Sequence, residues 1–536
     1  MTAGNDAPLN RRFRAPRGNG SILIDPPPAE VRGLLAANIQ RRRAHRCNLH
    51  GRSLDDLSTA GRQELVELAH RYTASYRKVD VPHECKRLLV AGHQPELFHP
   101  GVWFKNFALN RLARENDALP INLVIDNDTV KHVSLRVPGG SLEAPLVESI
   151  PFDVASDEIP YEERDIEDRT LFADFGERAS TWVHGLVPNP LLEEYWPLVR
   201  ARTNQTRNLG QCLSQARHQL EAAWGLQTLE IPQSQVCALQ AFHWFTSHVL
   251  VELPRFRDVY NDAVNAYRRL NHVRSANHPV PNLAIDGEWL EAPYWLWTSA
   301  APRRRRLFVR RHAAGMTLTD RRRIEFELPL ADGADPTHAI EALAGLAAQG
   351  IKLRSRALVT TLFARLVLSD LFVHGIGGAK YDQLTDELIR RFFGLEPPDY
   401  LVISATLHLA SATQGVAPDE VRHLDQELRD LEYHPERYIA ALHDWDRAPV
   451  DVARWLALKS QWLQTEQTRE NGRERCHAIR AANEALQAWI EPRRRDLLRR
   501  RHDAMRLSRA TSVLTSREYG FCLYPADTLR NFLVAV

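Results

Sequence analysis

One short segment, residues 91–105, gathers side chains that could bind an anion or move a proton. It reads Ala-Gly-His-Gln-Pro-Glu-Leu-Phe-His-Pro-Gly-Val-Trp-Phe-Lys, so His93, His99 and Lys105 fall close together. Imidazole transfers protons near neutral pH, and the lysine ammonium is a point charge whose pKa can shift. Because Lys105 lies about one helical turn beyond Pro100, its side chain is expected to point back toward the histidines.

The segment lies where a buried strand is expected to turn into a helix. Leu88-Leu89-Val90 is typical of such a strand, and the helix that follows carries apolar residues on one face. Open α/β sheets bind ligands at the carboxyl ends of their strands, and the first N–H groups of a helix lack internal partners. We therefore expect this turn to hold a phosphate or carboxylate, with contacts from Gly92, Gln94, His99 and Gly101.

A second group of candidates is Asp126-Asn127-Asp128, which ends a strand predicted over 120–125. Two carboxylates at a strand end could hold Mg²⁺ or serve as a general base for an amine. Ordinary turn chemistry explains Asp and Asn at this place equally well. His132 follows as a further candidate for ligand binding.

A third group lies between a strand predicted over 369–374 and a helix predicted over 381–393. Three glycines at this place allow a ligand to approach the backbone closely. The pattern lacks the dinucleotide fingerprint and the phosphate-loop ending, and by itself it favours a plain tight turn. The candidates for ligand contact here are Gly375, Gly377, Gly378, Lys380 and Tyr381.

The composition argues against several classes of protein. The 536 residues carry 69 Lys and Arg against 67 Asp and Glu, so charge gives no general case for nucleic acid. No apolar run approaches the roughly 20 residues of a membrane helix, and no secretory signal is apparent. The six cysteines have no paired spacing, which predicts reduced thiols in a cytoplasmic protein. His45, Cys47 and His50 are followed by no second ligand pair, so no zinc-type site is predicted.

The cationic residues are strongly biased toward arginine. Seven are lysines and the other 62 are arginines. Lys105, Lys131 and Lys380 nevertheless fall inside the segments described above. An ammonium group is needed at Lys105 and Lys380 if they bind or catalyse, although chance in a small sample explains the same placement.

The fold class predicted from these patterns is α/β, with a Rossmann-like nucleotide-binding core interrupted by a long insertion and followed by a helical region. Leucines recur at coiled-coil spacing near the C-terminus, which predicts a helical hairpin or short coiled coil there, while an ordinary amphipathic helical domain fits equally well. The predicted regions are a flexible N-terminus (1–28), a helical arm with the first half of the core (29–150), an insertion of helices and a β-hairpin (151–350), the second half of the core (351–415), the helical hairpin or coiled coil (416–510) and a C-terminal segment (511–536).

Together, the three motifs resemble those of the bacillithiol synthase family, the cysteine-adding ligases of bacillithiol biosynthesis. That family has Gly-Gln-Gln, Leu-Phe and Gly-Pro after its first strand, where this chain has Gly92-His93-Gln94, Leu97-Phe98 and His99-Pro100-Gly101. Its acidic strand end, Glu-Asp-His-Asp, is matched in part by 126–128. Its Gly-Pro-Gly-Glu and following Tyr are matched in spacing by Gly375, Gly377 and Tyr381.

The chain also departs from the family's pattern. His93 replaces a glutamine, Asn127 replaces a histidine, and Ile376 and Gly378 replace the proline and glutamate. The helix lysine of the family would fall at Phe107, so Lys105 does not align with it. These departures allow a relative that acts on another acceptor.

The resemblance implies an ATP- or ADP-binding ligase, with Mg²⁺ as a further candidate, and a homodimer formed through the C-terminal helices. The implied reaction joins the carboxyl group of cysteine, or a related carboxylate, to the amine of an amino-sugar conjugate such as glucosaminyl malate. His93, Lys105, Asp126 and Asp128 are then the catalytic candidates, either aspartate accepting the amine proton. Two other hypotheses remain: a nucleotidyltransferase acting on a sugar or small acid, and a non-catalytic oligomeric assembly protein.

Overall fold

The computed structural model describes residues 13–44, 47–80, 87–409, 419–442 and 450–535. Two compact units divide the chain. The first unit lies within 1–137, 148–409 and 517–536, and the second lies within 138–147 and 410–516. No helix formed by the described residues is long and apolar enough to cross a membrane.

The first unit is built around a mixed six-stranded sheet, which confirms the predicted α/β class. The strand order is β1-β16-β15-β4-β5-β8, with β1 antiparallel to β16 and the other neighbours parallel. Going outward from β4, β5 and β8 follow in chain order on one side, and β15 and β16 follow in chain order on the other. The direction of the chain order therefore reverses between β4 and β15. The strands are β1 (Ser21–Asp25), β4 (Leu88–His93), β5 (Leu119–Val124), β8 (Leu229–Pro232), β15 (Leu371–His374) and β16 (Tyr400–Thr406).

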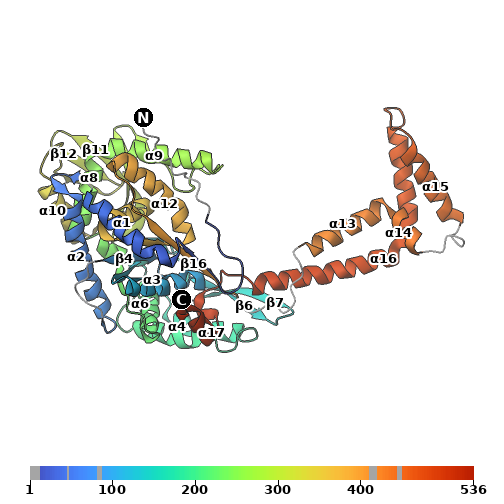
Figure 1. Cartoon of the computed structure of the whole chain (residues 1–536), viewed down its shortest axis with the longest axis horizontal. Helices are drawn as coiled ribbons and strands as arrows, with labels where there is room; N and C mark the ends of the chain where they lie inside the picture. The colour runs from blue at the N-terminus through green and yellow to red at the C-terminus, as the bar shows by residue number, and fades with distance from the viewer. Residues whose placement is uncertain (1–12, 45–46, 81–86, 410–418, 443–449, 536) are drawn as a thin grey trace. The chain divides into compact units, whose positions relative to one another are not determined.

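The central strands are mostly apolar and buried, and helices cover them. Every residue of β5 and β16 is buried, as parallel strands with covered faces require. Helix α3 (Pro100–Glu115) contacts β4, β5 and β16, helix α2 (Leu54–Ala74) contacts β8, and α12 (Ile376–Leu388) contacts β15 and β16 (Figure 1). The carboxyl ends of β4 and β15 therefore lie side by side, each followed by a helix.

A second, antiparallel sheet lies in the insertion, where the sequence predicted one hairpin. Instead of one hairpin, β12 (Gly315–Thr319) lies between β11 (Ala301–His312) and β13 (Glu325–Leu328) and pairs with both. The sequence missed β10 and β12 because their aromatic and Gly-Met-Thr residues lack clean alternation. The path is β13-β12-β11-β10-β14, formed by β10 (Trp289–Thr298), β11 (Ala301–His312), β12 (Gly315–Thr319), β13 (Glu325–Leu328) and β14 (Ile351–Ser355), with β9 (Ile285–Asp286) beside β10.

The remaining elements of the first unit are mostly helices, in agreement with the helical arm and the helices of the insertion that the sequence predicts. Side-chain caps start several of them: Asp168 accepts hydrogen bonds from the backbone N–H of Thr170 and Leu171 at the start of α4. These helices are α1 (Val31–Ala44), α4 (Arg169–Val183), α5 (Leu192–Arg202), α6 (Leu209–Ala223), α7 (Gln233–Val236), α8 (Gln240–Val251), α9 (Leu253–Leu270), α10 (Thr337–Gly345) and α11 (Ala357–Phe363). One short strand pair in this unit is β2 (Asn48–Leu49) with β3 (Arg52–Ser53). A second pair is β6 (Ser134–Gly140) with β7 (Pro145–Pro151), of which residues 138–147 are assigned to the second unit.

The second unit is helical, as the leucine spacing near the C-terminus predicts. Helix α13 (Glu420–Tyr433) runs antiparallel to α16 (Gly472–Leu514), because Asp425 pairs with Arg501 and Glu427 pairs with Arg493. Helices α14 (Pro435–Leu442) and α15 (Val450–Gln464) also pack on α16. Leucines of the predicted pattern, including Leu424, Leu431 and Leu486, form its buried core.

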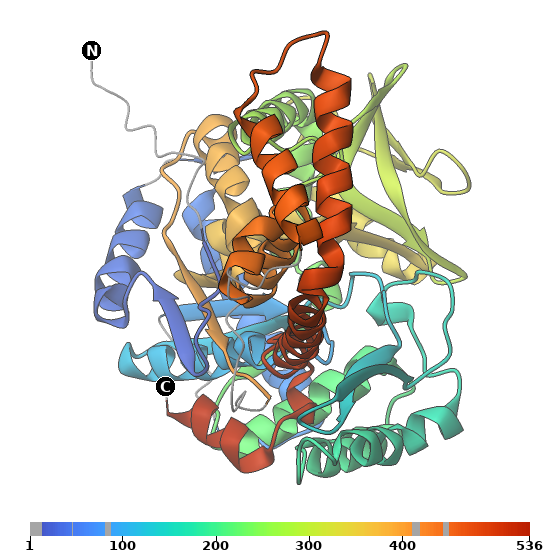
Figure 2. The same cartoon turned by 90° about the vertical axis from the view of Figure 1, so that its right-hand side faces the viewer.

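The N-terminal end of the first unit differs from the sequence prediction. The flexible N-terminus was predicted over 1–28, of which 1–12 lie outside the described residues, but Ser21–Asp25 forms edge strand β1. This five-residue run was too short to stand out from its polar surroundings. At the C-terminal end, α17 (Ala526–Val534) packs against α3 (Figure 2). The Phe532 and Phe104 rings lie 5.7 Å apart.

Candidate functional site

The turn between β4 and α3 is fixed by a helix cap and by the C-terminal segment. His99 occupies the N-cap of α3, and its Nδ1 accepts a hydrogen bond from the backbone N–H of Gly101 at 3.1 Å. Phe521 donates its backbone N–H to the carbonyl of Phe98 at 2.8 Å, and the two rings pack together. Residues far apart in sequence therefore hold this turn in one conformation.

Lys105 returns to the strand end, as its place one turn into the helix predicts. Its Nζ donates to the carbonyl oxygen of Gly92 at 2.6 Å, and the residue is only 2% exposed. Within the described parts of the chain, no carboxylate forms an ion pair with it. Burial, and then the nearby charge of Arg217, lower the pKa of Lys105 to about 7. A buried ammonium without a counter-ion favours an anion beside it.

His93 presents the lone pair of one ring nitrogen. Its Nδ1 lies 3.2 Å from the carbonyl oxygen of Gln94, which can only accept, so Nδ1 carries the proton and Nε2 does not. Burial, and then the charge of Lys105, lower the pKa of His93 to about 3. The ring packs edge-on against Phe98, with centroids 4.9 Å apart. His93 is therefore a neutral imidazole with an acceptor at Nε2.

His99 takes the opposite tautomer. Because its Nδ1 accepts the N–H of Gly101, the proton of the neutral ring lies on Nε2. That nitrogen lies 3.4 Å from Nη2 of Arg517, a residue of the C-terminal segment. Burial, and then the charge of Arg517, lower the pKa of His99 to about 4. Two hydrogen-bond donors thus face each other at the start of α3.

These assignments predict that neither histidine gains a proton between pH 8 and pH 5. Nitrogen-15 shifts of labelled histidines should show the Nδ1–H tautomer for His93 and the Nε2–H tautomer for His99, with His93→Asn and His99→Asn giving the assignment. Both folded pKa values lie below the unfolded value near 6.5, so the stability that these rings contribute at neutral pH is lost as pH falls below 6.5. Titration of either ring near pH 6.5 would contradict the assignment.

The acidic end of β5 lies beside this turn. Nε2 of Gln94 donates to Oδ2 of Asp128 at 3.1 Å, which joins the first two motifs. Asn127 points away from the turn and donates from Nδ2 to the carbonyl of Ser355. Asp126 accepts from both the backbone N–H and the hydroxyl of Ser234, at 2.8 and 2.5 Å. Three neighbouring residues thus face three different partners.

The carboxylate pair does not fit the Mg²⁺ site that the sequence suggested. Both oxygens of Asp126 already accept hydrogen bonds from Ser234, and those of Asp128 are used by Gln94, Arg304 and Thr129. A metal ion would have to displace these donors. Asp126 fits a base better, since burial, and then the charge of Glu162, raise its pKa to about 7.

The third motif lies at the neighbouring strand end but differs from prediction. Helix α12 begins at Ile376 rather than at 381, so Gly377 and Gly378 belong to its first turn instead of a separate loop. A Cβ on Gly378 would lie 2.8 Å from Nδ1 of His374, whereas Gly375 and Gly377 face open space. The small residues were taken for a turn, but here they bring the helix close to His374.

The other predicted binding residues make no hydrogen bond to the cluster within the described parts of the chain. Lys380 and His132 are exposed, although the charge of His132 lies close enough to act on Glu96. Tyr381 packs edge-on against His278, with ring centroids 5.7 Å apart. The structure therefore brings together residues at the ends of β4 and β5. The start of α12 is placed near them only because β15, which precedes it, pairs with β4.

Sequence reasoning missed a buried charge network behind the turn. Arg217 bonds to Glu221 and Glu230, each at 2.5 Å, and lies over the Phe98 ring. His218, Glu221 and Glu230 have the spacing of metal ligands, yet Arg217 already supplies the cation between the two carboxylates. Only the i, i+4 pairing of Arg217 with Glu221 was visible in sequence, and it resembles any helix surface pair.

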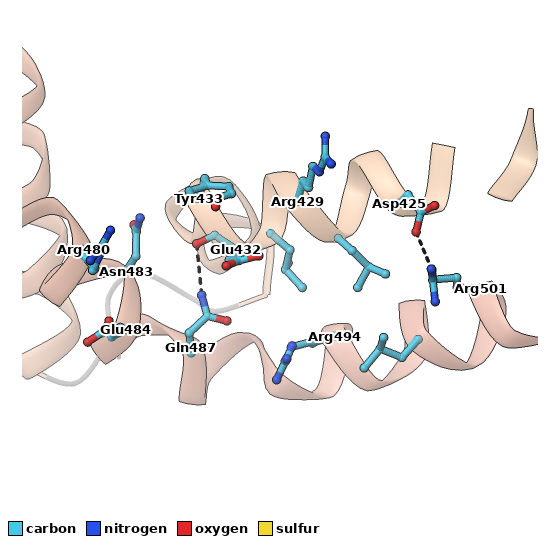
Figure 3. A pocket seen from close by; sticks show the side chains of 13 residues that line it. Asp425, Arg429, Glu432, Tyr433, Arg480, Asn483, Glu484, Gln487, Arg494 and Arg501 are labelled. Atoms are coloured by element: carbon cyan, nitrogen blue, oxygen red, sulfur yellow. Dashed lines mark hydrogen bonds and ion pairs between the residues drawn. The ribbon is translucent and has the colours of Figure 1, made fainter. Parts of the chain in front are cut away.

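A cavity among the described residues is lined by residues of the second unit alone. It has a volume of about 980 Å³ and opens between α13 and α16. Figure 3 shows its mixed charged lining, where Arg501 pairs with Asp425 and Gln487 donates to the carbonyl of Glu432. Its charges alternate in sign, so it offers no concentrated site for an anion.

Comparison with known proteins does not place the chain in a family. No family model matches the sequence, and no curated protein matches it. The conclusions about function therefore depend on the geometry of the strand ends.

Proposed function

We propose that the protein is a nucleotide-binding ligase that forms an amide bond at the carboxyl ends of β4, β5 and β15. The observation that carries the proposal is Lys105, a buried ammonium beside the β4 end with no carboxylate partner among the described residues. Such a charge is costly unless an anion compensates it. A phosphate or an activated carboxylate supplies that anion.

The strand order supports a nucleotide rather than another anion. The parallel strands β8-β5-β4-β15-β16 follow the order 3-2-1-4-5 of a Rossmann-like core. In such sheets ligands bind where the order reverses, here between β4 and β15. Helices α3 and α12 both begin at this point, and their first N–H groups favour negative charge. Open space beside Gly375 and Gly377 leaves room for phosphates.

The residues of the site match the needs of amide formation. The attacking amine must lose a proton, and Asp126, with a pKa near 7, can accept it at neutral pH. His93, with its pKa lowered to about 3, is too weak a base to share this role. Lys105 stabilises negative charge on the leaving phosphate or on the carbonyl oxygen. The cysteine and amino-sugar substrates, and the homodimer, are proposed from the resemblance to bacillithiol synthases.

Calorimetry with ATP and ADP tests the proposal. We expect the parent protein to bind ADP, and Gly377→Val to weaken binding by about tenfold or more, because the added side chain would fill the open space beside the start of α12. Gly345→Val is the matched control, because this helical glycine also faces open space but lies in α10. If the parent binds neither nucleotide, the ligase proposal has no basis.

A further inference from the structure

The C-terminal segment places a cation at the start of α3 that the proposed mechanism does not use. Arg517 is the first residue after α16 that belongs to the first unit, and its side chain is 17% exposed. Its Nη2 donates to the hydroxyl of Ser404 on β16 at 3.1 Å. Phe521, four residues on, anchors the segment through its bond to Phe98.

Two nitrogens of the Arg517 guanidinium group lack a hydrogen-bond acceptor within the described residues. Its Nη1 and Nε are buried and make no hydrogen bond within the described residues, although Glu518 lies 3.5 Å from Nε as an ion pair. An N–H group buried without an acceptor costs free energy, and more so when it is charged. Such a group indicates an acceptor that the protein itself does not supply.

The neighbouring imidazole gives a second, independent sign of the same acceptor. The tautomer of His99 directs its Nε2–H toward Nη2 of Arg517 at 3.4 Å, and neither group can accept from the other. Two donors at this separation repel each other unless an oxygen accepts from both. The hydroxyl of Ser404 completes a set of three polar groups from β16, α3 and the C-terminal segment.

We infer that Arg517, His99 and Ser404 form a second anion subsite, which binds an oxyanion of the same ligand that Lys105 binds. This inference rests on the proposed function and deepens it, because a ligand that reaches both subsites carries two separate anionic groups. The chemistry fits two sources: the phosphates of a nucleoside diphosphate, or a carboxylate on the acceptor substrate. Arginine suits this task, since its planar fork matches both groups.

The test measures by calorimetry how tightly the parent protein and Arg517→Met bind three ligands: ADP, pyrophosphate and succinate. Methionine keeps the length of the side chain without its charge. We expect the binding of ADP or of pyrophosphate to weaken by roughly tenfold to a hundredfold, the scale of a charge-assisted hydrogen bond. Arg530→Met, on the exposed face of α17, is the matched control and should bind like the parent. Unchanged unfolding temperatures would show that both variants fold.

Each outcome separates the subsite from the site around Lys105. If Arg517→Met loses affinity for succinate but not for pyrophosphate, the oxyanion is a carboxylate of the acceptor, and the subsite stands. If Arg517→Met binds all three ligands as tightly as the parent does, Arg517 is structural and the inference is wrong, while the proposed function is untouched. If the parent binds none of them, both proposals fail.

Discussion

Replacing Lys105 with methionine should weaken ADP binding by about a hundredfold while leaving the fold intact. Methionine keeps the unbranched stem packed in α3 but removes the charge. A charge-assisted contact in a buried site contributes up to about 3 kcal/mol, which corresponds to that loss. Because the ammonium has no counter-ion in the described residues, its removal should cost little stability or even add some. Calorimetry and thermal unfolding measure the two effects separately.

The chain offers a matched control for this prediction. Lys459 is also 2% exposed, but it lies in the second unit, where its Nζ donates to Glu436 and to the carbonyl of Tyr433. Lys459→Met should therefore destabilise the protein and leave ADP affinity unchanged. The opposite pattern, with Lys105→Met unfolding the protein and keeping affinity per folded molecule, would show that Lys105 is a structural residue.

Replacing Gly101 with alanine should destabilise the first unit by about 3 kcal/mol or more. An ideal Cβ at this position would lie 2.0 Å from the carbonyl oxygen of Ala405, and backbone cannot yield as a side chain can. Helix α3 would have to move away from β16, which also disturbs the cap at His99. Urea unfolding measures the loss, and the weakened cap should reduce ADP binding at the same time.

Gly33→Ala provides the comparison for that experiment. Gly33 lies in α1, is exposed, and faces open space where Cβ would be added. Alanine is the better helix former, so the variant should gain roughly 0.5–1 kcal/mol. If Gly101→Ala and Gly33→Ala were equally stable, α3 could move away from β16 at Gly101 without loss of stability, which would contradict the prediction.

The local parts of this site could be predicted from the sequence, because they follow from neighbouring residues. The apolar run at Leu88–Val90 and the Pro100 start indicate a strand and a helix, and their spacing gives the return of Lys105. The link between Gln94 and Asp128 follows from parallel strands ending at one edge. Each inference needed only the pitch of a helix or the direction of a strand.

The missed parts depend on contacts between distant segments. Arg517 lies 418 residues from His99, and no local pattern distinguishes it among 62 arginines. Arg304 belongs to a run of four arginines on β11, a pattern typical of a solvated surface, yet it pairs with Asp128 at 3.0 Å. The start of α12 was placed too late because glycines are weak helix formers, and the close packing of Gly378 on His374 outweighs that weakness.

The preference for arginine has a consequence for how the interior responds to acid and base. Burial alone would lower the pKa values of Arg217 and Arg365, but the carboxylates paired with them raise both. These guanidinium groups therefore stay ionised across every pH at which the protein is folded. The scaffold keeps a constant electrostatic field while Lys105 and Asp126, each with a pKa near 7, exchange protons with their surroundings. The heat of ligand binding, measured in buffers of different ionisation enthalpy, would then give the number of protons that Lys105 and Asp126 take up or release. Arg217 and Arg365 would add nothing to that number.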